Sequence, residues 1–128
     1  MTCVIFLAAI DEYDTYLETE DGQTHNRLKE SIELFRQIQL QNWLNNTTFI
    51  LFLNKRDIFE EKIKMSHIMD HFEDFLGFKG EAQAAYEFIR TKFHKTQPKN
   101  RPRNKTRMIY THHTTATGKP IQIKMRTF

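Results

Sequence analysis

The chain of 128 residues has a net charge of +3 and 39% hydrophobic residues, enough for the core of one globular domain or part of one, which excludes a disordered or fibrous chain. Its first apolar run, Val4–Ile10, is far too short to span a bilayer and lacks the basic leader and cleavage site of a signal peptide. The single cysteine, Cys3, excludes an internal disulfide and is typical of a cytoplasmic protein.

In the first half of the chain, apolar runs of strand length flank one helical pattern. Val4–Ile10 is continuously apolar, which is typical of a strand covered on both faces, and the acidic residues 11–23 predict a loop. Apolar residues at helical spacing then predict a helix over Thr24–Gln41. Asn45-Asn46 ends that helix, and Phe49–Leu53 predicts a second strand.

The second half of the chain predicts two further helices and a third strand. A short helix is expected over Ile58–Ile63 and a longer one over Glu81–His94. Residues 65–80 are ambiguous, because apolar residues at helical spacing precede two glycines. Met108–His112 predicts the third strand. Strands that alternate with helices indicate an α/β fold with parallel strands and crossover helices.

Charge is distributed unevenly along the chain. Residues 1–94 hold 10 of the 19 basic residues and all 16 acidic ones, whereas residues 95–128 hold nine basic residues and no acid. Such a segment attracts nucleic acid, acidic lipid or an acidic partner surface. The basic run Lys95–Arg107 has no interleaved aromatic residue for base stacking, so we expect a solvated loop and no nucleic-acid partner.

The second predicted strand runs directly into Asn54-Lys55-Arg56-Asp57. In open α/β sheets, ligands bind beyond the carboxyl ends of the strands. The Asp57 carboxylate can accept hydrogen bonds from the N1–H and exocyclic amine of guanine, whereas adenine would leave it unpaired. Asn54 can bond the base N7, and the Lys55 stem can lie along the base plane. The alternative is a strand that ends in an ordinary polar turn.

Further motifs spread along the chain carry a family resemblance. In order, they are Glu12-Tyr13-Asp14, Asn26–Ser31, Leu34-Phe35, Trp43 and Ile50–Ile63. Thr114-Thr115-Ala116-Thr117 follows the third predicted strand. Together these motifs resemble the α subunit of heterotrimeric G proteins, which carries Thr-Cys-Ala-Thr at the last position.

The resemblance implies a partial P-loop GTPase fold of the Ras-like, three-layer kind. Residues 1–123 would be the C-terminal part of the Ras-like GTPase domain, truncated at both ends, and residues 124–128 a divergent tail. The family continues after Ile121-Gln122-Ile123 into a long terminal helix that docks into receptors, so we expect that coupling to be lost.

The same resemblance implies roles for individual residues. Asn54, Lys55 and Asp57 would hold the guanine of GTP or GDP. Ala116 would offer its backbone N–H to the guanine O6, between Thr115, which replaces the family's cysteine, and Thr117. The acidic loop over residues 16–24 resembles the switch that senses the γ-phosphate, and the helix after it lies, in the family, near the effector-binding surface.

Other parts of the family's catalytic machinery do not occur in these 128 residues. There is no Gly-x-x-x-x-Gly-Lys-Ser/Thr motif to cradle phosphates and supply a magnesium ligand, and Gly118-Lys119-Pro120 follows the wrong residues. Asp21-Gly22-Gln23 predicts a plain turn rather than a catalytic glutamine. We therefore assign no catalytic residue, expect no hydrolysis by this chain alone, and expect guanine binding of about millimolar affinity, or about −4 kcal/mol.

Two main hypotheses for function follow. The first is a guanine nucleotide-binding signal transducer whose partners, by family, are β/γ subunits, receptors and effectors, located in the cytoplasm at the inner face of the plasma membrane through those partners. The second is a non-catalytic, truncated interaction module that competes for partners, and a gene remnant is a third. A metal at His67 and His71 would need a helix and a third ligand, so we predict none.

Overall fold

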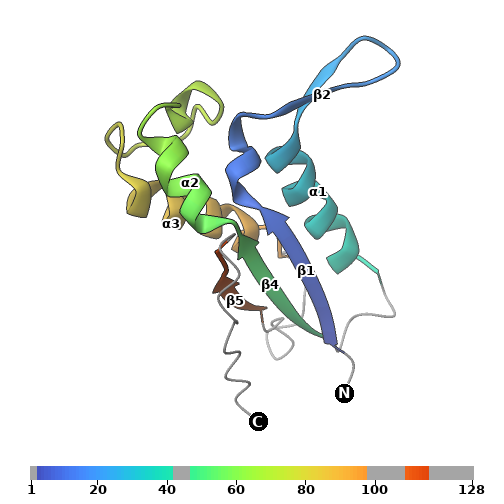
Figure 1. Ribbon diagram of the computed structural model, residues 1–128. Helices are drawn as coiled ribbons and strands as arrows, with labels where there is room; N and C mark the ends of the chain where they lie inside the picture. The colour runs from blue at the N-terminus through green and yellow to red at the C-terminus, as the bar shows by residue number, and fades with distance from the viewer. Residues whose placement is uncertain (1–2, 42–46, 98–108, 116–128) are drawn as a thin grey trace.

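A computed structural model describes residues 3–41, 47–97 and 109–115, which form an α/β fold with one parallel sheet and one small hairpin (Figure 1). The strands are β1 (Cys3–Ala9), β2 (Tyr16–Glu18), β3 (Thr24–Asn26), β4 (Thr48–Asn54) and β5 (Ile109–His113). The helices are α1 (Arg27–Gln39), α2 (Arg56–Ile63) and α3 (Ala82–His94), with 3-10 turns η1 (Ile10–Asp14) and η3 (Ile68–Asp70). The predicted α/β class with parallel strands is confirmed.

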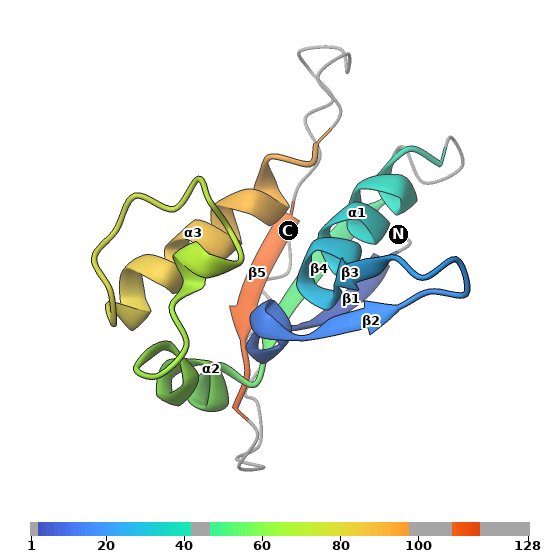
Figure 2. The ribbon, with the colours of Figure 1, turned by 90° about the horizontal axis from the view of Figure 1, so that it is seen from above.

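The parallel sheet has the strand order β1-β4-β5, so β4 is its central strand (Figure 2). Ala9 pairs with Asn54 at one end of β1 and β4, and Leu53 pairs with His113 at the same end of β4 and β5. Because all three strands run in one direction, their carboxyl ends meet at one edge of the sheet. The polar residues that follow β4 and β5 therefore come together there.

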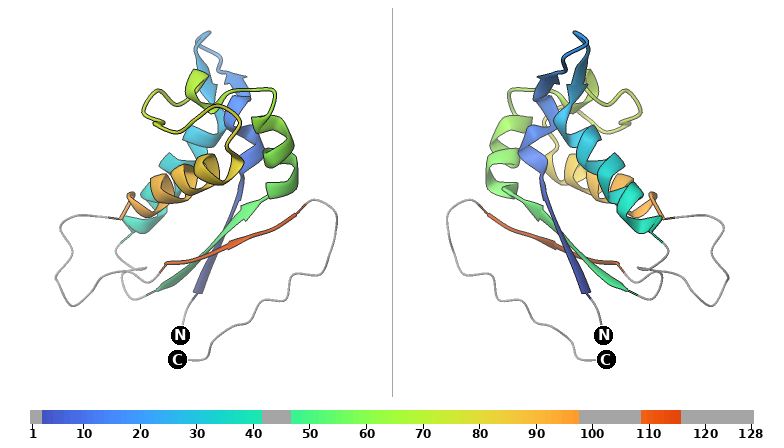
Figure 3. Two further views of the ribbon diagram at one scale, coloured as in Figure 1. Left: turned by 90° about the vertical axis from the view of Figure 1, so that its left-hand side faces the viewer. Right: turned by 90° about the vertical axis from the view of Figure 1, so that its right-hand side faces the viewer.

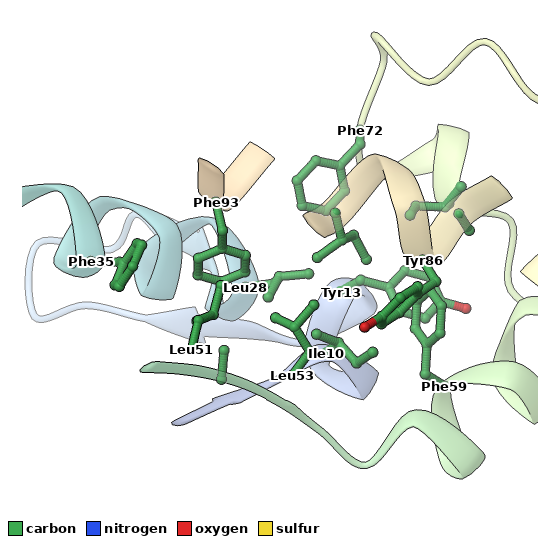
Figure 4. Close-up of a cluster of buried hydrophobic side chains, with 14 of the residues drawn as sticks. Ile10, Tyr13, Leu28, Phe35, Leu51, Leu53, Phe59, Phe72, Tyr86 and Phe93 are labelled. Carbon is green, nitrogen blue, oxygen red and sulfur yellow. The ribbon is translucent and has the colours of Figure 1, made fainter. Parts of the chain in front are cut away.

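Helices α1 and α3 cover one face of the sheet, as the side views show (Figure 3). An aromatic cluster fills the space between them and the strands (Figure 4). The ring of Phe35 in α1 lies 5.1 Å from that of Phe6, 5.7 Å from that of Phe49 and 5.7 Å from that of Phe93. These centroid distances suit tilted and edge-to-face aromatic packing, which fixes both helices on the sheet.

The opposite face of the sheet is less well covered in the part of the chain that the structure describes. Ile5 and Leu7 of β1 are 61% and 65% exposed, whereas Phe6 and Ala8, which alternate with them, are buried. The prediction that the first strand is covered on both faces, with Cys3 buried, is therefore wrong. Successive side chains of a strand point to opposite faces, and the described helices cover only one of them.

Helix α1 begins three residues later than its predicted start at Thr24. Asn26 caps the helix: its side-chain Oδ1 accepts hydrogen bonds from the backbone N–H groups of Leu28 and Lys29 at 3.0 and 3.1 Å. Its Nδ2 also donates to the carbonyl oxygen of Tyr13 at 2.6 Å. This buried side chain thus fixes the helix start against the turn that follows β1.

The loop predicted over residues 11–23 instead contains most of η1 and the strand β2, which forms an antiparallel hairpin with β3 at the predicted start of the helix. At the hairpin tip, Gly22 has a φ of +83° and its N–H donates to the carbonyl oxygen of Thr19 at 2.9 Å. A positive φ favours glycine, since it has no Cβ. The interpretation of Asp21-Gly22-Gln23 as a plain turn is confirmed.

The ambiguous segment 65–80 is mostly turns, with η3 as its one short helix. Phe72 and Phe75 are buried, whereas Phe78 is 78% exposed. His67 and His71 therefore do not lie one above the other on an α-helix. The predicted helices after the second strand and over residues 81–94 correspond to α2 and α3, and the third strand to β5. No helix within residues 3–41, 47–97 and 109–115 has the length and apolar character needed to cross a membrane.

Candidate functional site

The candidate site begins where β4 turns into α2. Between them, Lys55 has a φ of 63° and a ψ of 41°, and it is the only non-glycine residue of the described ranges with a positive φ. This left-handed conformation costs about 1–3 kcal/mol. Two hydrogen bonds of the Lys55 backbone hold this conformation. The Lys55 N–H donates to the side-chain Oδ1 of Asn54 at 2.9 Å, and the Phe59 N–H donates to the Lys55 carbonyl oxygen at 3.0 Å.

Asp57 lies in the first turn of α2 and is partly buried. The N-terminal end of a helix favours a carboxylate, because the first backbone N–H groups point along the axis with partial positive charge. The left-handed turn at Lys55 and the helix start thus put the three residues predicted to hold guanine on one short, sharply bent stretch. Their role as ligands stays a prediction.

A second segment meets this turn directly after β5. The Thr114 hydroxyl donates to Asn54 Oδ1, the Thr114 N–H donates to the carbonyl oxygen of Leu53 at 3.0 Å, and Arg56 N–H donates to the carbonyl oxygen of Thr114 at 2.9 Å. Thr114 is only 5% exposed. Because Asn54 Oδ1 is engaged in two bonds, Nδ2 is the atom of this side chain that suits an acceptor such as a purine N7.

The next residue, Thr115, is exposed and follows this joint immediately. Ala116 and Thr117 lie outside the described residues, so the predicted contact from the Ala116 N–H to the guanine O6 stays a prediction. The structure does bring Thr114, the first residue of the Thr114–Thr117 motif, to the Asn54–Asp57 motif. The two motifs meet because β4 and β5 end at the same edge of the sheet. Thr114 belongs to this site, and it was absent from the residues that the sequence predicted to hold the base.

Arg56 was also missed, because its partners lie far away in the sequence. Its guanidinium contacts α3 and β5 as well as its own helix, with Cζ 4.0 Å from the centroid of the Tyr86 ring. Arg56 also makes a local i,i+4 ion pair on α2, where its Nε donates to Glu60 Oε1 at 2.9 Å.

The charged guanidinium affects the titration of its neighbours. Burial and the positive charge of Arg56 lower the pKa of His113, against an opposing effect of Glu60 and with a small further decrease from His112. Burial raises the pKa of Tyr86, while Arg56 and Arg90 act in the opposite direction. His113 is therefore held neutral, and its Nδ1 can accept a hydrogen bond from Arg56 Nη1 at 3.2 Å.

A second polar cluster ties the hairpin region to the segment after α2. The Tyr13 hydroxyl donates to the Ser66 carbonyl oxygen at 2.6 Å, and the Tyr16 hydroxyl is hydrogen-bonded to His71 Nδ1 at 2.6 Å. Burial raises the pKa of Tyr13 to about 12, so it is a neutral donor at physiological pH. The contacts of His71 are therefore with Tyr13 and Tyr16.

No group of three or more His, Cys, Asp or Glu side chains that could hold a metal ion occurs within the described ranges. Magnesium needs several oxygen ligands in near-octahedral geometry. We therefore assign none of the described residues to a metal.

The fold places the chain among known nucleotide-binding architectures. The parallel sheet with crossover helices is a partial Ras-like GTPase fold. The family model for the G-protein alpha subunit matches residues 1–123, and the chain belongs to that family. The chain is also 40% identical over 116 residues to the guanine nucleotide-binding protein alpha-12 subunit of Dictyostelium discoideum. That match covers 91% of this chain and 31% of the relative, so the chain spans about a third of the length of that protein.

Proposed function

We propose that this chain forms the base-recognition part of a guanine nucleotide-binding signal transducer of the G-protein α-subunit family. One observation carries the proposal: Thr114 and Asn54 are joined by a hydrogen bond although 60 residues separate them. This contact supports a composite site in which the segments after β4 and β5 act together. Membership of the family supports guanine nucleotide as the ligand.

The proposed contacts follow from the chemistry of the base. The Asp57 carboxylate accepts hydrogen bonds from the guanine N1–H and exocyclic amine, and the Lys55 stem covers one face of the ring. Asn54 Nδ2 donates to N7, and the backbone N–H of Ala116 donates to O6, with Thr115 and Thr117 on either side. Adenine has an acceptor at N1 and no amine at C2, so it offers the Asp57 carboxylate neither of the two donors that guanine provides.

The proposal for these residues concerns the base alone. GTP or GDP is the proposed nucleotide, and residues 1–123 are proposed as the C-terminal part of a Ras-like GTPase domain, with residues 124–128 as a divergent tail. The 128-residue sequence contains no phosphate-binding Gly-x-x-x-x-Gly-Lys-Ser/Thr motif, so no phosphate contact and no hydrolytic step is assigned to it. By family, the proposed partners are β/γ subunits, receptors and effectors, and the proposed location is the cytoplasmic side of the plasma membrane.

A second function is favoured by a groove between the hairpin and α1. Leu17 and Leu34 are 48% and 51% exposed, and together with Glu12, Arg27, Glu30 and Gln37 they line this groove. Apolar side chains rimmed by charged ones suit a protein partner. A non-catalytic module that competes for partners through this groove is therefore the alternative proposal.

A titration distinguishes the two proposals. The 128-residue chain is titrated with GMP and AMP up to several millimolar, with backbone amide resonances of Asn54, Lys55 and Asp57 as the readout. We expect GMP to bind at about millimolar affinity and AMP more weakly. Equal binding of the two nucleotides would overturn the guanine site. Binding of GDP at micromolar affinity or better would instead argue against the competing module.

A matched variant tests the role of Asp57. Asparagine offers one acceptor and one donor, a pattern that suits the N1–H and the C2 carbonyl of xanthine. Asp57→Asn is therefore expected to lose the preference for GMP and to favour XMP. Glu61→Gln, a neutralisation on the exposed side of α2, is the control and should leave GMP binding unchanged.

A further inference from the structure

The turn that carries Asn54, Lys55 and Asp57 requires an external restraint. Lys55 is held in the left-handed region, where residues other than glycine rarely reside, and its two local hydrogen bonds are both made within residues 54–59. An unrestrained turn of this kind would relax toward ordinary backbone angles and take the neighbouring carboxylate with it.

Arg56 lies at the centre of this turn and connects it to two other elements. Its Nη2 donates to Gln83 Oε1 of α3 at 2.7 Å, and its Nη1 donates to His113 Nδ1 of β5 at 3.2 Å. The guanidinium also lies over the ring of Tyr86, with Cζ 4.0 Å from the ring centroid. The Arg56 side chain itself is only 17% exposed, although its hydrogen bonds to Gln83 and His113 lie at the surface.

The backbone of the same residue links the two motif segments. Arg56 N–H donates to the carbonyl oxygen of Thr114 at 2.9 Å. Main chain and side chain of one residue therefore connect the segment after β4 with β5 and the segment after it. The backbone of Lys55 and Asp57, its two neighbours, is therefore restrained through Arg56.

A guanidinium suits this position and an ammonium does not. The flat group stacks on Tyr86 while donors on its edges point toward Glu60, Gln83 and His113. A lysine at the same position has one nitrogen at the end of a flexible stem, so it can reach one of these acceptors at a time.

We propose that Arg56 is a positioning residue that holds the base-recognition turn in register with the segment after β5 and so sets the preference for guanine over adenine. The inference rests on the proposed function, because a preference must exist before a residue can set it. Arg56 touches no base in this arrangement; it acts through Lys55 and Asp57 on one side and Thr114 on the other.

Two measurements on the 128-residue chain test the inference. In the first, Arg56→Lys is expected to speed amide hydrogen exchange of residues 54–57 and 114 about tenfold, with α1 amides unchanged. In the second, the same variant is expected to lose about tenfold of the GMP-over-AMP preference while far-UV circular dichroism stays unchanged. Arg90→Lys, on the exposed face of α3, is the matched control and should change neither quantity.

Variants at Tyr86 separate positioning from general destabilisation. Tyr86→Phe keeps the ring under the guanidinium and should keep the preference, whereas Tyr86→Leu removes the aromatic face and should lose part of it. A parent chain with no GMP preference would overturn the proposed function itself. A parent chain with a preference that Arg56→Lys fully retains, at unchanged amide exchange, would overturn only the role of Arg56.

Discussion

Lys62 of α2 donates a hydrogen bond of 2.6 Å to Asp14 Oδ1 at the end of η1. The same ammonium donates to the carbonyl oxygen of Asp11 at 2.9 Å. Both side chains are partly buried, at 33% and 19% exposed. The helix that begins with the proposed base-recognition turn is thus fixed at its other end to the turn that leads into the hairpin.

We predict that this pair contributes to stability above acidic pH. Burial alone would raise the pKa of Asp14, but the hydrogen bond and charge of Lys62, together with hydrogen bonds from Ser66 and the backbone, lower it overall. A lowered carboxyl pKa stabilises the fold above the unfolded-state value of 3.8, and this stabilisation is lost as the pH falls through the folded-state pKa. Asp14→Asn should therefore cost about 1 kcal/mol in urea unfolding at pH 7 and less in acid.

A double-mutant cycle with Lys62→Met provides the control for this prediction. If the pair acts as described, the two substitutions together cost less than the sum of the two single ones. Strict additivity at pH 7 would show that the contact contributes nothing to folding.

His94 should make the free energy of unfolding fall between neutral and mildly acidic pH. Burial, with a further contribution from the charge of Arg90, lowers its pKa below 6.5. The unfolded chain therefore binds the proton more readily, so the fold is most stable above pH 6.5 and weakens as the pH falls from there to the folded-state pKa. His94→Gln should reduce this dependence in chemical denaturation, and His113, whose pKa is also lowered, should account for the remainder.

Thr111 supplies the comparison for that experiment. His94 Nε2 lies 2.6 Å from Thr111 Oγ1. Thr111→Val removes this partner but leaves the burial and Arg90 in place, so the pH dependence should persist. A flat profile in the parent chain would contradict the assigned role of His94.

Lys55→Gly should separate stability from recognition. Glycine relieves the left-handed conformation at φ 63°, but it also makes the unfolded chain more flexible, so the free energy of unfolding should stay within about 1 kcal/mol of the parent. GMP binding should nevertheless weaken, since the stem proposed to cover the base is gone. Unchanged GMP affinity would remove Lys55 from the proposed site. Lys64→Gly, at the far end of α2, controls for loss of an exposed lysine.

The exposed face of β1 should promote association of the isolated chain. Ile5 and Leu7 are both more than half exposed on a strand at the edge of the described sheet. Leu7→Thr keeps a residue that suits strands and removes apolar surface, so sedimentation should show less self-association at nearly unchanged stability. Ala8→Thr, on the buried face, should instead destabilise the fold. Equal sedimentation of parent and Leu7→Thr would argue that this face is inert.

The pattern of apolar residues predicted those elements whose side chains are buried in the core. Phe49–Leu53 and the helix over residues 81–94 have side chains that pack against the core, and both were placed to within about one residue. The hairpin was missed because all three residues of β2 are exposed, so it carries no alternation of buried and exposed side chains. The start of α1 was missed because Thr24–Asn26 pairs with β2 in the hairpin, a contact that helical spacing does not indicate.

The exposure of β1 illustrates a different limit of prediction from the sequence. A run that is apolar on both faces does not reveal which face is covered, because that depends on elements packed from elsewhere in the chain. For the same reason, the sequence indicated Asn54, Lys55 and Asp57 as candidates for the base site. It did not indicate the residues that hold them in place. Thr114 contacts Asn54 and Arg56 contacts His113 across 60 and 57 residues, and no local spacing indicates such contacts.

The hydrogen bond between Asn54 and Thr114 also has a consequence for synthesis of the chain on the ribosome. Translation at about 5–20 residues per second leaves the first half of the proposed site without its partner for roughly 3–12 s, since 60 residues must be added before Thr114 exists. During that interval β4 lacks its neighbour β5, and a pulling-force assay on nascent chains should register docking only after residue 114 has emerged. Guanine recognition would then have to wait until the segment after β5 has been synthesised.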